Sequence, residues 1–290
     1  MRNCCIEPLT AISKPPGLST TPTWNQPLPK IDGHLAEALK LLCNYFERKR
    51  IPFALVGALV PAILLSSDVG ARETRDADHV IKLASWAEWE SVISDLAKLG
   101  FKQSRGEQEH RLHYQTAEID LIPYGITQGP EEVLVWRKSG NHMNLTGFAE
   151  VFAHAKQTKI VEGLTLPVIP LWLFAVLKVV AYLDRKYPRD LGDLLYIMEQ
   201  YEANQARRFE LSGSAGISSY EDAGAYLLGN DIRDNVSLKA LDTVKSFIAQ
   251  ITDDHHAIIN TILRETNSLY SDERRRFVYQ QIQALRNGLG

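Results

Sequence analysis

Strand-like and helix-like segments are separated along this chain, which limits the folds that it can adopt. Short apolar runs typical of strands occur at 53–56, 77–83 and 164–168, and two or three more fall between Phe101 and Ile122. From Leu171 onward, apolar residues recur at helical spacing. The sequence therefore predicts an α+β protein, in which a small mixed β-sheet with helices is followed by a mainly α-helical C-terminal domain.

Three regions are expected along the chain. Residues 1–30 hold six of the thirteen prolines and predict a flexible arm. Residues 31–168 form the α/β domain, with helices at 33–49, 58–66, 86–99 and 147–154, a further strand at 133–137 and a turn-rich loop at 125–130. Residues 169–290 form the helical domain, with helices at 171–185, 189–203, 220–228, 236–250, 254–268 and 272–286. The boundary lies near Pro167 and Pro170.

The composition is that of an ordinary globular protein. Of the 290 residues, 45% are hydrophobic and 23% charged, and the net charge of −3 gives no overall attraction to nucleic acid. Three cysteines, two of them in the arm, predict neither a disulfide framework nor a zinc site. We find no secretion signal, and prolines and Lys178 interrupt the most apolar segment. We therefore expect a cytoplasmic protein with no membrane partner.

Three aspartates are expected to form one cluster. Asp76 and Asp78 are one residue apart in a strand-like run, so their side chains should point to the same face. Asp120 lies in a second such run, and strand pairing would bring it beside them. Clustered carboxylates repel one another unless a cation neutralises them, and Mg²⁺ prefers oxygen ligands. The pattern suggests metal-assisted nucleotidyl transfer, whereas the alternative is a pair of solvated acids at a strand edge.

Several segments resemble a known family. Val56-Gly57-Ala58, Arg72-Glu73-Thr74-Arg75-Asp76-Ala77-Asp78 and Glu118-Ile119-Asp120 resemble the DNA polymerase β-like nucleotidyltransferase superfamily. The R-x-T-x-D-x-D form is similar to its AbiEii-type branch, which contains the nucleotidyltransferase toxins of toxin–antitoxin and phage-defence systems. Segments 177–185, 189–194 and 223–229 are also similar to that branch.

The resemblance implies roles for the first-domain residues. Asp76 and Asp78 would hold Mg²⁺ on the triphosphate, and Asp120 would complete a second metal site or act as general base. Two Mg²⁺ ions are expected, with Mn²⁺ as a substitute. The remaining nucleotide-binding residues would be Gly57 and Ala58 through their backbone, Arg72 through its guanidinium, and Thr74 as a brace of the loop.

The resemblance also implies three residues in the helical domain. Lys178 would reach the triphosphate, and Asp190 and Asp193 would line the cleft. The alternative for Lys178 is an ion pair with either aspartate, because a lysine on an apolar helix needs a charged partner. The two aspartates would also suit the first turn of a helix. We assign no metal-binding role to His110 and His113, which should face opposite sides of a strand, and we interpret His79 as structural.

Two functions follow as alternatives. In the first, an enzyme transfers NMP from an NTP to an acceptor and releases pyrophosphate; the family favours RNA, notably tRNA, over a protein or a small molecule such as an antibiotic. A toxin of this kind would have an antitoxin partner. In the second, the chain is a non-catalytic nucleotide- or partner-binding module. Ala58, where the family usually has Ser or Gly, and the long interval from Gly57 to Asp76 favour this second function.

Overall fold

The computed structural model describes residues 31–65, 76–106, 108–126, 132–203, 205–211, 217, 219–253, 255–266 and 271–290. It confirms the α+β class, with a mixed sheet in the first part of the chain and helices alone from Leu171 onward. The predicted arm at 1–30 lies outside the described residues.

A seven-stranded sheet has the strand order β3-β4-β5-β2-β1-β9-β8. Its strands are β1 (Phe53–Val56), β2 (Asp76–Lys82), β3 (Lys102–Gln103), β4 (Arg111–Tyr114), β5 (Ala117–Tyr124), β8 (Lys156–Val161) and β9 (Leu164–Val168). The pairs β2–β5 and β1–β9 are parallel and the others antiparallel, so the sheet is mixed as predicted. A separate two-stranded hairpin consists of β6 (Val133–Val135) and β7 (His142–Asn144).

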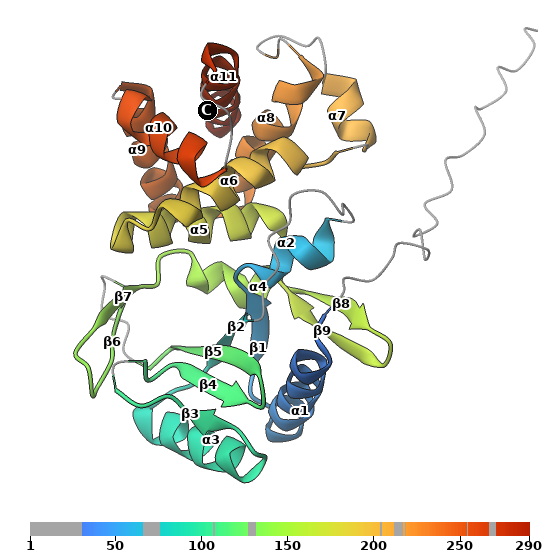
Figure 1. Ribbon diagram of the computed structural model, residues 1–290, viewed down its shortest axis with the longest axis vertical. Coiled ribbons are helices and arrows are strands. Elements are labelled where there is room, and N and C mark those ends of the chain that lie inside the picture. The colour runs from blue at the N-terminus through green and yellow to red at the C-terminus, as the bar shows by residue number, and fades with distance from the viewer. Residues whose placement is uncertain are drawn as a thin grey trace, which may run out of the picture.

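Helices α1 (Gly33–Lys49) and α3 (Trp86–Lys98) lie below the sheet in Figure 1, away from the helical half. Asp32 caps α1 by accepting hydrogen bonds from the backbone N–H groups of His34 and Leu35, which satisfies donors that a helix leaves unpaired at its start. The short α2 (Leu59–Leu64), a 3₁₀ turn (Phe148–Glu150) and α4 (Val151–His154) lie on the side toward the helical half.

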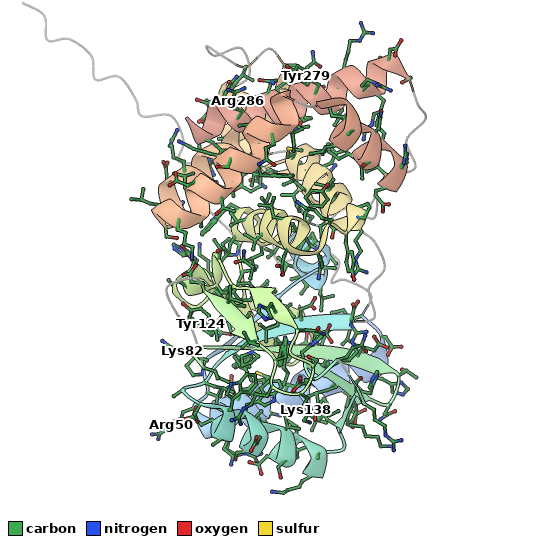
Figure 2. The ribbon with its side chains drawn as sticks, turned by 90° about the vertical axis from the view of Figure 1, so that its left-hand side faces the viewer. Arg50, Lys82, Tyr124, Lys138, Tyr279 and Arg286 are labelled. Carbon is green, nitrogen blue, oxygen red and sulfur yellow. The ribbon has the colours of Figure 1, made fainter. Side chains whose placement is uncertain are left out.

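The helical half packs above the sheet. It contains α5 (Leu171–Arg185), α6 (Pro188–Gln200), α7 (Ala206–Leu211), α8 (Tyr220–Asn235), α9 (Leu238–Asp253), α10 (His255–Glu265) and α11 (Asp272–Leu289). Figure 2 shows Tyr279 and Arg286 of α11 at the end of the molecule opposite to Arg50 and Lys138. Among the described residues, no helix combines the length and the apolar character that a membrane span requires.

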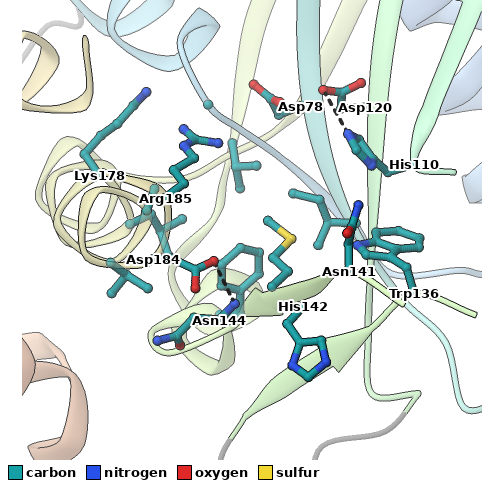
Figure 3. A pocket seen from close by; sticks show the side chains of 18 of the residues that line it. Asp78, His110, Asp120, Trp136, Asn141, His142, Asn144, Lys178, Asp184 and Arg185 are labelled. Atoms are coloured by element: carbon teal, nitrogen blue, oxygen red, sulfur yellow. Dashed lines mark hydrogen bonds and ion pairs between the residues drawn. The ribbon is translucent and has the colours of Figure 1, made fainter. Parts of the chain in front are cut away.

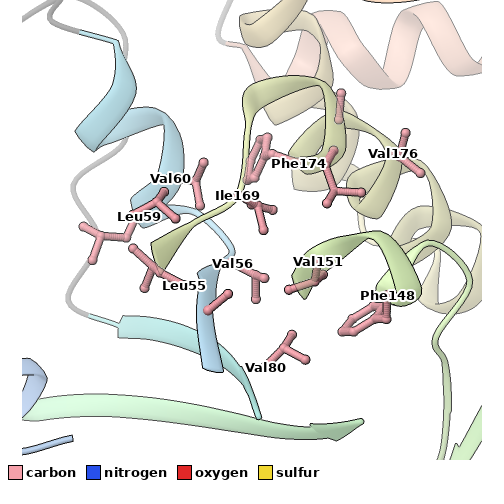
Figure 4. Packing of buried hydrophobic residues seen from close by; sticks show 14 of the residues in the cluster. Leu55, Val56, Leu59, Val60, Val80, Phe148, Val151, Ile169, Phe174 and Val176 are labelled. Carbon is pink, nitrogen blue, oxygen red and sulfur yellow. The ribbon is translucent and has the colours of Figure 1, made fainter. Parts of the chain in front are cut away.

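The hydrophobic core runs through both parts of the chain. Helix α5 is apolar on most sides, and its Phe174 lies toward Ile169 and Val56 at the end of β1 (Figure 4). All three side chains are at least 97% buried, so the contact excludes water. The sheet ends at Val168 and α5 begins at Leu171, near the expected boundary. The division into two domains stays a prediction.

Some predicted elements differ from the structure. Strands β7 and β8 and helix α7 were not expected. The strand β8 lies at an edge of the sheet and has the polar sequence KQTKIV, which hides the apolar pattern of a buried strand. Helix α8 continues to Asn235 instead of ending at Leu228, because Ile232 continues its buried face. The strand expected at 133–137 ends at Val135.

Candidate functional site

Strand register brings Asp78 and Asp120 side by side. In the parallel pair of β2 with β5, Asp78 lies opposite Asp120, and Asp76 lies opposite Glu118. Because side chains alternate along a strand, Asp76 and Asp78 share the face on which Asp120 also lies. Figure 3 shows the carboxyl groups of Asp78 and Asp120 next to each other at one wall of a cavity. This arrangement agrees with the expected cluster.

Gly57 directly follows β1 and lies against Asp78. The register of β1 with β2 pairs Val56 with Asp78, so the residue after β1 passes beside the Asp78 carboxyl group. A Cβ atom at Gly57 would lie 1.7 Å from Oδ2 of Asp78, and the backbone φ of +75° also disfavours other residues. Gly57 is therefore needed for Asp78 to occupy its place. Ala58 follows as the residue before α2, and it does not line the cavity.

Burial and neighbouring carboxylates change the acidity of Asp78. Its pKa is raised to about 7, first by burial and then by the charges of Asp120 and Asp76, whereas the charges of Lys178 and Arg185 oppose the change. The carboxyl group therefore holds its proton near neutral pH unless a cation takes the proton's place.

Arg111 of β4 neutralises Asp120. It lies opposite Asp120 in the β4–β5 register, and its Nε and Nη2 atoms donate hydrogen bonds of 2.8 Å to the two carboxyl oxygens. Its Nη1 atom lies 3.0 Å from Glu118. The hydrogen bonds to Asp120 raise the pKa of Arg111, so the guanidinium stays charged. Arg111 was not among the residues that the sequence predicts for the site.

His110 is a second residue that sequence reasoning set aside. Its Nε2 atom lies 3.8 Å from Oδ2 of Asp120, and its ring packs against Trp136 with centroids 5.5 Å apart. Burial lowers the pKa of His110, although the charge of Asp120 opposes the change. His113, by contrast, bonds to Ser104 and does not line the cavity. His79 is buried with a pKa lowered to about 4 by burial, in agreement with a structural role.

The opposite wall of the cavity comes from α5 and carries paired positive charges. Nζ of Lys178 lies 3.1 Å from Oδ1 of Asp190 and 2.6 Å from Oδ2 of Asp193. The contact with Asp193 is an ion pair that lacks the geometry of a hydrogen bond. Arg185 also donates two hydrogen bonds to Asp190, which is fully buried. The ion-pair alternative for Lys178 is thus present. Asp190 lies in the first turn of α6, but Asp193 lies in the second, because α6 begins at Pro188.

The cavity between these walls measures about 420 Å³, within the range of small-ligand sites. The predicted residues Gly57, Asp78, Asp120 and Lys178 line it, whereas Asp76, Asp190 and Asp193 are not among its lining residues. Unpredicted lining residues include Arg185 and Asp184 of α5 and several from the hairpin side (Figure 3). These are Trp136, Asn141, His142, Met143 and Asn144.

Glu109 holds the hairpin in place. Its buried Oε1 atom accepts hydrogen bonds of 2.8 Å from the backbone N–H groups of both Lys138 and Ser139. These two residues form the turn between β6 and β7. Glu109, His110 and Arg111 are consecutive, so one short segment fixes the hairpin, flanks Trp136 and neutralises Asp120.

The donor set fits a divalent cation in part. Asp76 and Asp78 offer carboxyl oxygens from one face of β2, which suits Mg²⁺. Both oxygens of Asp120, however, already accept hydrogen bonds from Arg111. Within the described ranges, no group of three His, Cys, Asp or Glu side chains is arranged to hold a metal ion. The two remaining predicted residues, Arg72 and Thr74, lie outside the described residues.

Two solved structures resemble the chain loosely. An antigenic nucleotidyltransferase-like protein from Paracoccidioides brasiliensis aligns over 78% of this chain and 92% of its own, with 14% identity and a TM-score of 0.44. The antibiotic-resistance factor ANT(2'')-Ia aligns over 77% of this chain and 95% of its own, with 10% identity and a TM-score of 0.37. No protein-family model matches the chain, and no curated protein matches it. At these values neither structure establishes a family or an activity for this chain.

Proposed function

We propose that the protein is a nucleotidyltransferase that moves NMP from an NTP to a hydroxyl group of an acceptor. The observation that carries this proposal is the placement of Asp78 beside Asp120 across a ligand-sized cavity from Lys178 and Arg185. A triphosphate bound there would meet positive side chains on α5 and a cation-binding pair of aspartates on β2. The motif resemblance of Gly57, Asp76, Asp78 and Asp120 to the polymerase β-like superfamily supports the same reaction.

The reaction is an in-line displacement at the α-phosphorus of the NTP. The acceptor oxygen forms a bond to this phosphorus, the bond to the bridging oxygen of the β-phosphate breaks, and pyrophosphate leaves with the electron pair. The hydroxyl proton passes to a carboxylate of the cluster, for which the resemblance indicates Asp120. Bound Mg²⁺, or Mn²⁺ in its place, would neutralise the charge that develops on the phosphate oxygens, with Asp76 and Asp78 as its protein ligands.

The acceptor follows from the resemblance to the AbiEii-type branch. We propose an RNA, with tRNA as the first to test, and we propose that the activity is toxic and held in check by an antitoxin protein. The side chains on the hairpin side of the cavity, among them Asn141, His142 and Asn144, offer hydrogen-bonding groups for a nucleoside. A protein or small-molecule acceptor would occupy the same cavity.

The test is transfer of label from an α-³²P-labelled NTP to RNA, with Mg²⁺ present. Asp78→Asn keeps the size of the side chain but removes its charge, and we expect a loss of at least about a hundredfold in labelling. Asp234→Asn is the matched control, because Asp234 is an exposed aspartate of α8 paired with Arg233. Labelling by Asp78→Asn at the wild-type rate would contradict the proposed reaction.

A second candidate is a nucleotide-binding module without catalysis. The ion pairs favour it, because Arg111 engages both oxygens of Asp120 and two aspartates engage Lys178. Such a module would bind NTP with no release of pyrophosphate. Steady, Mg²⁺-dependent release of pyrophosphate by the wild-type protein would exclude it.

A further inference from the structure

The turn that joins α5 to α6 is basic and carries an exposed aromatic ring. It has the sequence Arg185-Lys186-Tyr187-Pro188-Arg189, and all five residues are exposed. Tyr187 is 50% exposed, so it is one of the few large hydrophobic residues that the described part of the chain leaves at its surface. The ring takes no part in the core, and packing therefore does not explain it.

Two guanidinium groups lie over the ring of Tyr187. The Cζ atom of Arg185 is 5.1 Å from the ring centroid, and the Cζ atom of Arg189 is 5.4 Å from it. Lys186 repeats the arrangement, with its Nζ atom 5.1 Å from the centroid of the Tyr182 ring. Proteins hold single-stranded nucleic acid with such interleaved cations and rings, because the rings stack on bases and the cations contact phosphates.

Neighbouring acids do not neutralise the outward charges of this turn. Arg185 donates its hydrogen bonds to Asp190, which is fully buried. Asp184, the exposed acid before the turn, accepts a hydrogen bond of 3.3 Å from the backbone of β7. Among the described residues, ion pairs of this region go to Lys178 and Arg185, and none includes Lys186 or Arg189. These two cations can therefore attract an anionic partner, although the whole chain has a net charge of −3.

The turn lies at the rim of the cavity. Asp184 and Arg185 line the cavity, and the ring of Tyr187 contacts the guanidinium of Arg185. In Figure 1 the turn lies on the same side of the molecule as the β6–β7 hairpin, which forms another wall of the cavity. An acceptor with its hydroxyl group inside the cavity would therefore have the rest of its chain close to this turn.

We propose that the α5–α6 turn binds the single-stranded end of an acceptor RNA. Tyr187 stacks on a base, and Lys186 and Arg189 contact the phosphates. A base within a duplex is already stacked on its neighbours, so a single-stranded end suits this ring better. The inference rests on the proposed function, because it assigns the surface that holds the acceptor of the same cavity.

Fluorescence anisotropy of a labelled RNA measures this binding without any turnover. The full-length protein is titrated at low salt into a single-stranded RNA of about 12 nucleotides. Tyr187→Ala should weaken binding about tenfold or more, because the stacking of one base is lost. Tyr187→Phe keeps the ring and should stay within about twofold of the wild type. Tyr279→Ala is the matched control, because Tyr279 is an exposed tyrosine of α11 far from the turn (Figure 2).

The charges of the turn give an independent measurement. A variant with both Lys186→Gln and Arg189→Gln should lower the slope of log Kd against log salt concentration by about 1.4, because each of two phosphate contacts contributes about 0.7. Tyr187→Ala should keep the wild-type slope, since it removes no charge. Arg276→Gln changes an exposed arginine of α11 and should also keep the slope.

Equal affinities of Tyr187→Ala and Tyr279→Ala for the RNA would overturn this inference, and so would a wild-type salt slope in the double variant. Absence of RNA binding by the wild type, or equal binding of a duplex of the same sequence, would overturn it as well. The nucleotidyltransferase proposal would survive each of these results if label still passed to a protein or small molecule and Asp78→Asn abolished that transfer. Transfer that Asp78→Asn leaves intact would overturn the proposed function instead.

Discussion

Gly57 and Asp78 are packed so closely that no side chain fits between them. We predict that Gly57→Ala displaces the Asp78 carboxyl group, because the added Cβ would lie 1.7 Å from its Oδ2 atom. The variant should lose about 3 kcal/mol of unfolding free energy, from the clash and from the positive φ. It should also lose Mn²⁺ binding. Urea denaturation and Mn²⁺ titration measure the two effects.

The matched control is Gly163→Ala. Gly163 has a φ of +71°, close to the +75° of Gly57, but no atom lies within 4 Å of its Cβ position. This variant should therefore show the backbone strain alone, about 1 kcal/mol, with Mn²⁺ binding intact. Equal losses in the two variants would mean that contact with Asp78 plays no part.

Asp78 should also make stability depend on pH. Its pKa in the folded chain is about 7, above its ordinary value of 3.8, so the folded state holds the proton more tightly. The resulting stabilisation is fully present below pH 4 and is lost as the pH rises through 7. Asp78→Asn does not titrate, so its stability relative to the wild type should increase by up to on the order of 4 kcal/mol between pH 4 and pH 8.

Urea denaturation at several pH values with EDTA present measures this difference. His79 changes stability in the opposite direction, because its pKa of about 4 lies below its ordinary value, and stability from this group is lost as the pH falls from 6.5 toward 4. That contribution is common to both proteins and cancels in the comparison. A difference between the two proteins that stays constant with pH would show that Asp78 ionises normally.

Among single residues, the sequence predicted the aspartates of the site but not the side chains that contact them. Asp76 and Asp78 share a strand, so period-two alternation alone places them on one face. Arg111 and His110 reach the cluster only through the β4–β5 register, which depends on the turn at Gln115 and Thr116. Gln115 has a φ of +52° without being Gly or Asn, so the usual turn signal is missing.

Among the elements, long amphipathic or apolar helices were the easiest to predict. The bounds of α1 and α5 agree with those expected, because their apolar spacing is regular and Asp32 and Pro170 lie directly before their first residues. The first strand of the β6–β7 hairpin was predicted but the second, His142–Asn144, was not, since it is short and largely polar. Its position depends on tertiary contacts, above all on the buried Glu109 carboxylate.

This contact gives a prediction for the hairpin as a unit. Glu109→Ala removes the acceptor of two backbone hydrogen bonds at the β6–β7 turn, a loss of about 2 kcal/mol of local stability. Hydrogen exchange of the Lys138 and Ser139 amides should then be roughly thirtyfold faster. Glu90→Gln is the control, because Glu90 contacts Arg137 next to this turn through an exposed pair only. Unchanged exchange in Glu109→Ala would mean that the hairpin is held from elsewhere.

Across the whole molecule, the sheet and the helices share one continuous core. Phe174 of α5 is 99% buried and lies toward β1 and Ile169, at the contact between the two parts (Figure 4). A chain with such a core should unfold in a single cooperative transition, although the sequence divides it into two regions. Differential scanning calorimetry of the wild type tests this, and two separate transitions would show independent domains.

Phe174→Ala distinguishes a shared core from two cores that merely touch. The cavity left by the ring should cost about 3–5 kcal/mol, and in a shared core the loss should appear in both parts at once. Hydrogen exchange should then become faster in β1 and in α8 by similar factors, because both open through the same global unfolding. Phe209→Ala is the control, since Phe209 is 60% exposed on α7 and should change stability by less than about 1 kcal/mol. Faster exchange confined to α5 and the other helices would show that the sheet is stable without them. The cavity between the sheet and α5 would then form only when two separately folded domains dock.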